Sequence, residues 1–357
     1  MKLLVTGHNG YIGSVMTDFL IGAGHQVSGL DSFFFEHDTL GEEPQPITTL
    51  RKDIRDVRAT DLVSFDAVIH LAALSNDPLG SLNAEVTYAI NHQASVRLAR
   101  LTKEAGVSRY LFASSCSLYG VAGDAMLSED ASFNPITPYG ISKVRVEEEV
   151  SRLAGERFTP TFLRNATAYG ASPRFRGDIV VNNLVAAATT TGRVSILSDG
   201  SPWRPLVHVE DICRAFLAVL HAPRESVHNQ AFNVGLTSEN YRVSDLAEMV
   251  QELVPGSQIE YALGGLPDPR CYRVDCSRLG EVLPEFQPKW TVRRGIEELV
   301  SVFRAWGLSR AEFEGGTFMR IEQILKLRNA GKLDASLRWC SPRPGLEPAG
   351  ARVGSSQ

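Results

Sequence analysis

This 357-residue chain contains no long hydrophobic run. Its apolar stretches all stay well short of the about 18 residues that a membrane-spanning helix requires. At the N-terminus, Lys2 is followed by a short apolar run and then by a glycine-rich turn, which leaves no room for the apolar core of a signal peptide. We therefore expect no membrane partner and a cytoplasmic location.

Cysteine is scarce, and its spacing excludes the common zinc patterns. The chain has five cysteines, an odd number, and eight histidines that form no ligand cluster. Reduced thiols are the simple expectation for a cytoplasmic protein. We predict no metal site, and we interpret His70 and His208 as packed, hydrogen-bonded side chains of apolar strand-like segments.

An excess of positive charge is also absent. Lys and Arg number 36 against 41 Asp and Glu, so the net charge is −5. No general basic field would draw the chain to nucleic acid, although a local basic site for a phosphorylated small molecule remains open. The apolar fraction of 43% and the charged fraction of 22% are typical of a globular protein.

What the chain does contain is a glycine-rich turn near its start. Gly7, Gly10 and Gly13 follow the apolar residues 3–5 and precede an amphipathic helical pattern. In a dinucleotide-binding turn, the first glycine permits the tight turn, the second lets the backbone approach a pyrophosphate, and the third lets helix and strand pack closely. The helix N-terminus adds free N–H groups for the phosphates. The pattern predicts a dinucleotide site, with a plain glycine turn as the alternative.

Asp31 ends the second expected strand and narrows the choice of cofactor. A carboxylate at this point accepts hydrogen bonds from the adenosine ribose hydroxyls and would repel a 2′-phosphate. No Lys or Arg lies between Gly7 and Asp31 to bind such a phosphate. NAD is therefore predicted rather than NADP, and a surface aspartate is the alternative interpretation.

Strand and helix patterns alternate up to about residue 165 and then loosen. The alternation predicts an α/β fold, a doubly wound Rossmann parallel sheet with helices on both faces. We expect a Rossmann domain over residues 1–165 and a smaller nucleotide-sugar-binding region over 166–310. An extra C-terminal helix is expected within 311–340, and a disordered tail rich in Pro, Gly and Ser over 341–357.

Two further segments contain residues suited to proton transfer. Tyr139 and Lys143 are four residues apart at the start of an expected helix, which puts both side chains on one face. A lysine ammonium beside a phenol lowers the phenol pKa, so that Tyr139 can move a proton on or off a substrate hydroxyl. Ser114 and Ser115 end a buried strand where the nicotinamide should lie. Taken alone, the Tyr–Lys spacing is more typical of an exposed pair on a helix.

Together these features resemble the extended short-chain dehydrogenase/reductase family, in its NAD-dependent nucleotide-sugar epimerase/dehydratase branch. The resemblance covers about residues 1–300, and its motifs occur in the order typical of the family. The matching residues are the three glycines, Asp31, Asp53-Ile54, His70-Leu71-Ala72-Ala73, Asn91, Ser114 to Gly120, Tyr139, Lys143, Arg164-Asn165, Tyr169-Gly170, Asn183, Arg204, His208 to Asp211, Arg270 and Asp275.

The resemblance implies a role for each matched residue. The cofactor would contact Gly7, Gly10, Tyr11, Ile12, Gly13, Asp31, Asp53, Ile54, Leu71, Ala72, Ala73, Asn91, Ser114, Tyr139 and Lys143. Catalysis would depend on Ser115, on Tyr139 as acid and base, and on Lys143 as its partner. The nucleotide sugar would contact Ser115, Asn165, Asn183, Arg204 and Arg270, and guanidinium forks suit its phosphate oxygens.

The chain departs from the family pattern directly after the catalytic serine. Sugar 4,6-dehydratases carry an Asp-Glu pair there, and the related decarboxylases carry a Glu at the second position. This chain has Cys116 and Ser117, and neither is a carboxylic acid, so those reactions are not expected. Some GDP-sugar epimerases use a cysteine two residues before the Tyr that matches Tyr119. Cys116 lies three residues before it and is interpreted as structural.

We therefore expect an NAD-dependent isomerase of carbohydrate biosynthesis, a nucleotide-sugar epimerase that inverts C4 of an NDP-hexose through a transient 4-keto intermediate. One alternative is an NDP-ketosugar reductase with exchangeable cofactor. The other is a non-catalytic NAD-binding regulatory protein, which has no need of Ser115, Tyr139 and Lys143 together. A homodimer is the expected assembly, and the sequence leaves the base and the sugar open.

Overall fold

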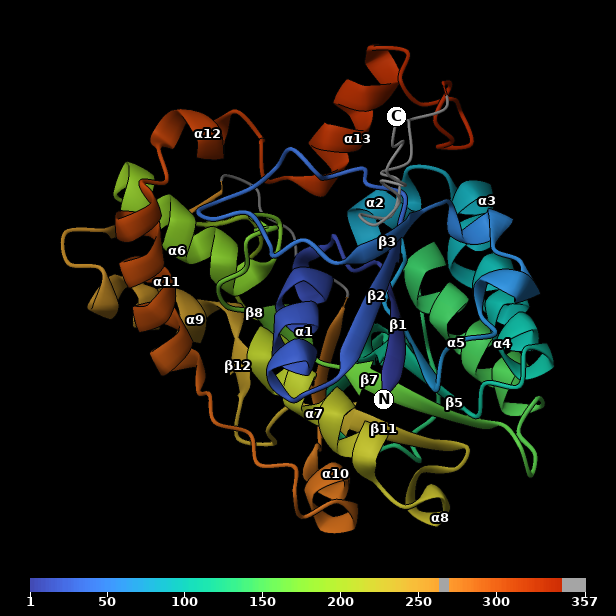
Figure 1. Ribbon diagram of the computed structural model, residues 1–357. Coiled ribbons are helices and arrows are strands. Elements are labelled where there is room, and N and C mark those ends of the chain that lie inside the picture. The colour runs from blue at the N-terminus through green and yellow to red at the C-terminus, as the bar shows by residue number, and fades with distance from the viewer. Residues whose placement is uncertain (263–269, 342–357) are drawn as a thin grey trace.

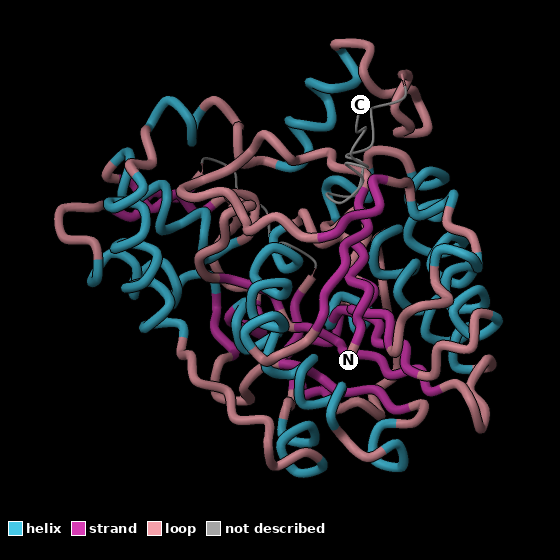
Figure 2. Tube along the Cα trace, viewed as in Figure 1, coloured by secondary structure: helices cyan, strands magenta, loops and turns pink. Residues whose placement is uncertain are grey.

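The computed structural model describes residues 1–262 and 270–341. Its main element is a seven-stranded parallel sheet in the order β11-β7-β5-β4-β1-β2-β3. Figures 1 and 2 show these strands in the interior, with helices on both sides of the sheet. The predicted Rossmann fold is confirmed. The strands are β1 (Lys2–Thr6), β2 (Gln26–Asp31), β3 (Thr48–Arg51), β4 (Ala67–His70), β5 (Arg109–Ser115), β7 (Thr159–Asn165) and β11 (Gln230–Val234).

Alternating side chains explain how the sheet is covered. Leu3 and Val5 pack on one face in a core cluster with residues of α1 (Tyr11–Gly22) and α7 (Val209–His221). Leu4 packs on the other face in a cluster with residues of α4 (Ala94–Glu104) and α5 (Pro138–Ser151). Because successive strand side chains point to opposite faces, a sheet buried on both faces requires uninterrupted apolar strands. This requirement accounts for the short apolar runs of the sequence.

Residues after 165 complete the main sheet and, together with residues 121–127, build a smaller region. β11 pairs with β7, so the sheet extends past the boundary expected at residue 165. The smaller region contains a three-stranded sheet, β12-β10-β8, and the pairs β13–β9 and β14–β6. These strands are β6 (Val121–Leu127), β8 (Thr167–Tyr169), β9 (Arg193–Ile196), β10 (Trp203–His208), β12 (Asn240–Arg242), β13 (Gln258–Tyr261) and β14 (Cys271–Val274).

The helices of the smaller region pack around a core of their own. Leu184 of α6 (Val180–Thr191), Leu246 of α9 (Val243–Leu253) and Leu299 of α11 (Val292–Trp306) belong to this cluster. The shorter helices are α2 (Asp77–Ser81), α3 (Ala84–Thr87), α8 (Arg224–Val227), α10 (Ser277–Val282) and α12 (Arg310–Glu314), and a π-helical stretch spans Tyr88–Gln93. Among the helices of the described ranges, none has the length and apolar character needed to cross a membrane.

The C-terminal segment, residues 310–341, contains α12 and α13 (Arg320–Asn329). In Figure 1, α13 lies at the carboxyl end of the sheet, close to α2 and to the loop after β2. The expectation of a disordered tail over 341–357 falls, except for its first residue, outside the described residues.

Candidate functional site

The glycine-rich turn joins β1 to α1 at the carboxyl end of the sheet. Gly7 has φ of +74°, which glycine adopts without strain, and a Cβ there would lie 2.7 Å from the backbone nitrogen of Ala72. A Cβ on Gly13 would overlap the carbonyl oxygen of Gly7. The absence of side chains lets the turn fold tightly beneath α1, which begins at Tyr11 and directs its free N–H groups outward.

A cleft of about 1000 Å³, counting space open to solvent, lies in front of this turn. Its walls suit a dinucleotide, because they combine backbone N–H groups for phosphates, carboxylates for hydroxyls and apolar side chains for flat rings. The predicted cofactor residues that line it are Gly7, Gly10, Tyr11, Ile12, Gly13, Asp31, Asp53, Ile54, Leu71, Ala72 and Ala73.

Asp31 lies at the end of β2, with both carboxylate oxygens held by backbone groups. Oδ2 accepts from the N–H of Asn9 at 3.0 Å, and Oδ1 from that of Phe33 at 2.7 Å. Arg51 is brought beside Asp31 by the pairing of β2 with β3. Its guanidinium forms an ion pair with Glu36 at 2.6 Å and lies over the Phe33 ring. Sequence reasoning missed this cation because it belongs to a different strand.

We expect Asp31→Ala to weaken NAD binding about 10-fold or more, because charge-assisted hydrogen bonds to the ribose are lost. NADP binding should fall less, since the repulsion of its 2′-phosphate is relieved. Calorimetric titration of cofactor-free protein with both nucleotides measures the two changes. Tighter binding of NADP than of NAD by the unsubstituted protein would contradict the assigned role of Asp31.

Asp53 and Ile54 also line the cleft. The Asp53 carboxylate caps the short helix Ile54–Asp56 and is bonded by the Arg55 guanidinium at 2.6 Å. Burial alone would raise the pKa of Asp53, but the hydrogen bonds from Arg55 outweigh it and hold that pKa below its usual range. An ionised and oriented acceptor of this kind suits the exocyclic amino group of an adenine ring.

Four predicted cofactor residues lie outside the cleft lining, namely Asn91, Ser114, Tyr139 and Lys143. The Asn91 amide is buried and bonds both the N–H and the carbonyl of Leu74, at 2.8 and 3.0 Å. It therefore supports the backbone that follows the wall at residues 71–73. Ser114 is also buried and donates to the Glu147 carboxylate. Both side chains are engaged by the protein itself.

The three predicted catalytic residues come together at the end of β5 and the start of α5. Thr137 caps α5 by accepting from the Gly140 N–H, which sets the first turn that carries Tyr139. The Ser115 hydroxyl forms a hydrogen bond with the Tyr139 phenol. Lys143 Nζ lies 5.6 Å from the centre of the Tyr139 ring and donates to the Ala113 carbonyl at 2.6 Å. The helical spacing thus brings both side chains to the strand end.

The electrostatics of this group differ from the sequence expectation in one respect. Burial raises the pKa of Tyr139 to about 12, and the hydrogen bond from Ser115 only partly offsets that rise. Burial also lowers the pKa of Lys143 to about 7, opposed by the charge of Glu147. The predicted lowering of the phenol pKa is therefore not seen, because the effect of burial outweighs that of the hydrogen bond. The Tyr139 phenol is therefore protonated at neutral pH unless a further positive charge lies beside it.

The predicted sugar-binding residues divide into two groups. Arg204 on β10 donates to the carbonyl oxygen of Arg270, so these two arginines lie together. Arg270 pairs with Asp77 at the start of α2, and the charge of Asp77 acts on Tyr139. Sequence reasoning missed Asp77, because its role depends on contacts between distant segments. A substrate diphosphate near the arginines would place its sugar close to Tyr139.

The two predicted asparagines lie on different elements, Asn165 at the end of β7 and Asn183 in α6. Asn165 pairs with Ser115 across β5 and β7, and its buried side-chain oxygen has no hydrogen-bond partner. That oxygen is an unused acceptor at the catalytic strand end. Asn183, in α6, donates to the Gly177 carbonyl at 2.7 Å.

The chain matches the model of the NAD-dependent epimerase/dehydratase family over residues 3–235. The chain belongs to this family. The resemblance inferred from the motifs is thereby confirmed, and the NAD dependence of the family agrees with the cofactor predicted from Asp31.

Relatives and solved structures of this family cover most of the chain. UDP-glucose 4-epimerase of Mycolicibacterium smegmatis is 30% identical over 85% of this chain and 99% of its own length. UDP-glucuronic acid decarboxylase 1 of Arabidopsis thaliana is 28% identical, over 88% of this chain and 72% of its own. The structure of MoeE5 in complex with UDP-glucuronic acid and NAD is 28% identical, with a TM-score of 0.74 over 85% of this chain and 99% of that one.

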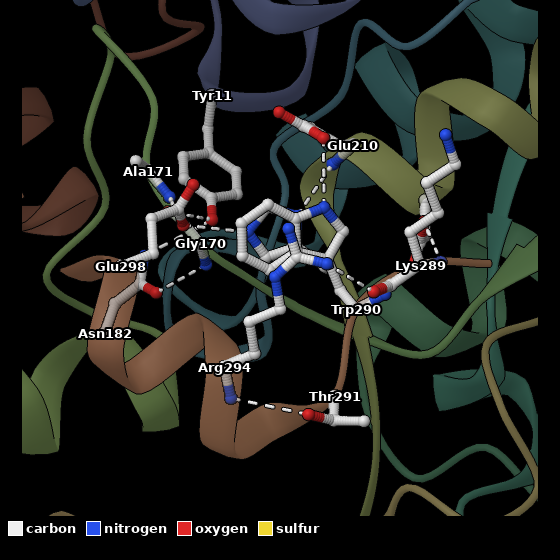
Figure 3. A network of polar contacts seen from close by, with 12 residues as sticks. Tyr11, Gly170, Ala171, Asn182, Glu210, Lys289, Trp290, Thr291, Arg294 and Glu298 are labelled. Atoms are coloured by element: carbon white, nitrogen blue, oxygen red, sulfur yellow. Dashed lines mark hydrogen bonds and ion pairs between the residues drawn. The ribbon is translucent and has the colours of Figure 1, made fainter. Parts of the chain in front are cut away.

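A network of polar contacts ties the glycine turn to the smaller region (Figure 3). The Tyr11 hydroxyl donates to the Gly170 carbonyl at 2.8 Å, and Asn182 bonds both Tyr11 and the Gly170 N–H. Glu298 of α11 accepts from the Ala171 N–H at 3.1 Å. The N-terminus of α1 is therefore oriented by residues from far along the chain. Sequence reasoning selected Asn183 and missed its neighbour Asn182.

The two histidines interpreted as packed residues are buried and hydrogen-bonded. His208 stacks on Trp290 at 3.9 Å between ring centres and contacts the Glu298 carboxylate at 2.9 Å. His70 lies between the hydroxyls of Thr6 and Ser95. Within residues 1–262 and 270–341, no group of three or more His, Cys, Asp or Glu is arranged to hold a metal ion.

Proposed function

We propose that the protein is an NAD-dependent nucleotide-sugar epimerase that inverts C4 of a UDP-hexose through a transient 4-keto intermediate. The observation that carries the proposal is the group formed by Ser115, Tyr139 and Lys143, with no carboxylic acid at positions 116 and 117. The M. smegmatis relative, named as a UDP-glucose 4-epimerase, supports the choice of reaction and of nucleotide.

Each residue of the group has a definite task. Bound NAD supplies the group that accepts a hydride and returns it. Its oxidised nicotinamide ring also supplies a positive charge. With the positive charge of Lys143 and of the nicotinamide beside it, the ionised Tyr139 phenol would take the proton of the 4-hydroxyl as the C4–H bond breaks and return it when that bond forms again. Ser115 holds the same oxygen by a hydrogen bond, so that it stays in place while the sugar changes face. Lys143, anchored on Ala113, supplies positive charge beside the phenol.

Cys116 and Ser117 argue against the dehydratase and decarboxylase reactions of other family members. The Cys116 thiol is buried and donates to the Arg164 carbonyl at 3.1 Å. Burial raises the pKa of that thiol well above its ordinary value, so it is neither a thiolate nor an acid at neutral pH. Ser117 lies against the Ser115 hydroxyl at 3.1 Å. Neither side chain can supply the proton that loss of water requires.

We expect Cys116→Ala to leave turnover within about threefold of the unsubstituted enzyme, because the thiol faces protein atoms and not the reacting carbon. Steady-state kinetics with a UDP-hexose measure the change, and a thermal unfolding curve reports the small cavity separately. A loss of 100-fold or more, as expected for removal of an acid or base, would restore a cysteine-based mechanism.

An NDP-ketosugar reductase would use the same three residues, so only a measurement of the reaction distinguishes a reductase from an epimerase. Purified protein is incubated with UDP-glucose or UDP-galactose without added cofactor, and the configuration at C4 is followed by NMR. Interconversion of the two epimers with no net consumption of cofactor supports the proposal. Turnover confined to a ketosugar, with stoichiometric oxidation of NADH or NADPH, would identify a reductase. Absence of any turnover despite NAD binding would favour a regulatory protein.

A further inference from the structure

The C-terminal segment, residues 310–341, lies beyond the part of the chain that resembles the family, yet it closes one end of the cofactor cleft. Its last turns are anchored on the adenosine side of the cleft. Trp339 Nε1 donates to the Ser32 carbonyl at 2.7 Å, and the Trp339 ring lies 5.9 Å from that of Phe34. Arg55, which holds Asp53, donates to the Ser336 carbonyl at 2.8 Å. The segment therefore contacts the cofactor walls directly.

Arg320, the first residue of α13, reaches from this segment into the cleft. It is one of the lining residues although only 2% of its surface is exposed. Its guanidinium lies over the Phe35 ring at 4.1 Å, and Nη2 donates to the Arg174 carbonyl at 2.8 Å. These contacts hold the flat guanidinium in a fixed orientation at the cleft wall.

The second terminal nitrogen of Arg320 has unused bonding capacity. Nη1 is buried without a hydrogen-bond partner, and the nearest carboxylate oxygen, Asp38 Oδ2, is 3.9 Å away and also unpartnered. Two neighbouring arginines differ, since Arg174 pairs with Glu43 and Arg176 with Asp178, each at 2.8 Å. Asp38 is thus near enough to form an ion pair but too far for a hydrogen bond, which leaves Nη1 able to donate to the anion of a ligand.

The Arg320 guanidinium stays charged although it is buried. Desolvation, reinforced by the nearby charge of Arg176, lowers the pKa of Arg320 to about 10, so the guanidinium remains protonated at neutral pH. Arg176 and the glycine turn line the same cleft. A dinucleotide carries its negative charge on the pyrophosphate, between its two nucleosides. The cleft thus has fixed positive charge from a segment that the family motifs do not include.

We propose that Arg320 is a cofactor-binding residue, supplied by the C-terminal segment, whose guanidinium bonds a phosphate oxygen of NAD and slows release of the cofactor. The proposal depends on NAD binding and not on the choice between epimerase and reductase. An enzyme that reuses one cofactor molecule in every turnover benefits from slow release, which links the segment to the proposed function.

The test compares binding of NAD with binding of adenosine, which lacks the phosphates. Arg320→Met should weaken NAD binding about 10- to 100-fold, the range for loss of a charged hydrogen bond. Adenosine binding should stay within about twofold. Arg328→Met, the same substitution on a more exposed arginine of α13, is the matched control and should leave both unchanged. Calorimetry gives the affinities, and displacement of bound NADH, followed by fluorescence, gives the release rate.

A purely structural role predicts a different result. If Arg320 only holds the cleft wall in place, its loss should weaken NAD and adenosine equally, and that outcome would overturn the proposal. Unchanged NAD affinity in the variant would overturn it as well. Arg320→Gln, which keeps a donor for the Arg174 carbonyl but loses the charge, carries the same expectation and replaces the Met variant if that protein does not fold.

Discussion

Replacing Tyr139 by Phe should lower kcat by about 10²–10⁴-fold, the usual scale for a positioned acid or base. The ring and its packing against α2 remain, because only the hydroxyl is removed. NAD and the UDP-hexose should therefore bind with affinities within about threefold of those of the unsubstituted enzyme. Steady-state kinetics give kcat, and titration calorimetry of both ligands gives the affinities.

The control for this variant is Tyr261→Phe, which removes the same atom from a tyrosine that is 54% exposed at the end of β13. Its kcat should match that of the unsubstituted enzyme. If Tyr139→Phe retains near-full turnover, another group moves the proton. A loss of ligand affinity as large as the loss of kcat would instead assign Tyr139 a binding role.

The second large effect is expected at Glu147, on the helix that carries Tyr139 and Lys143. Glu147 and Arg164 form a buried ion pair at 2.8 Å, and Glu147 also accepts from Ser114. Burial alone would lower the pKa of Arg164, but hydrogen bonds and charge from Glu147 outweigh it and raise that pKa. Glu147→Gln leaves this cation buried without its anion, and such a change costs about 3–5 kcal/mol of unfolding free energy.

The same substitution should also reduce turnover, because Glu147 opposes the lowering of the Lys143 pKa. Without that carboxylate the Lys143 pKa, already lowered to about 7, should fall further, so that less of the lysine is charged at neutral pH. Urea unfolding and a pH profile of kcat measure the two effects. Glu148→Gln, at the exposed neighbouring position, is the control. Equal unfolding free energies of the two variants would show that the buried ion pair contributes little to stability.

Local motifs allowed much of this site to be predicted from the sequence. The glycine turn and the i,i+4 pair of Tyr139 and Lys143 depend on short-range geometry, and the structure brings both to the carboxyl end of the sheet. Patterns could not reveal residues that meet across the fold. Arg51 reaches Asp31 through strand pairing, and Asp77 reaches Arg270 through contact of distant segments.

Other differences follow from finer geometry. Asn182 and Asn183 are neighbours in α6, so their side chains point about 100° apart, and only Asn182 reaches Tyr11. The phenol pKa depends on burial, which a motif does not report. Arg320 lies beyond the family motifs, so no pattern placed it in the cleft.

The homodimer and the cytoplasmic location remain predictions from composition and resemblance.

The most direct test of the central claim follows a deuterium label placed at C4 of the UDP-hexose. In the proposed reaction the hydrogen that leaves C4 is returned to C4 on the opposite face. The epimer formed in ordinary water should therefore keep its deuterium at C4, which NMR and mass spectrometry both measure. Replacement of the label by hydrogen, from solvent or from added unlabelled NADH, would contradict epimerisation by a retained cofactor.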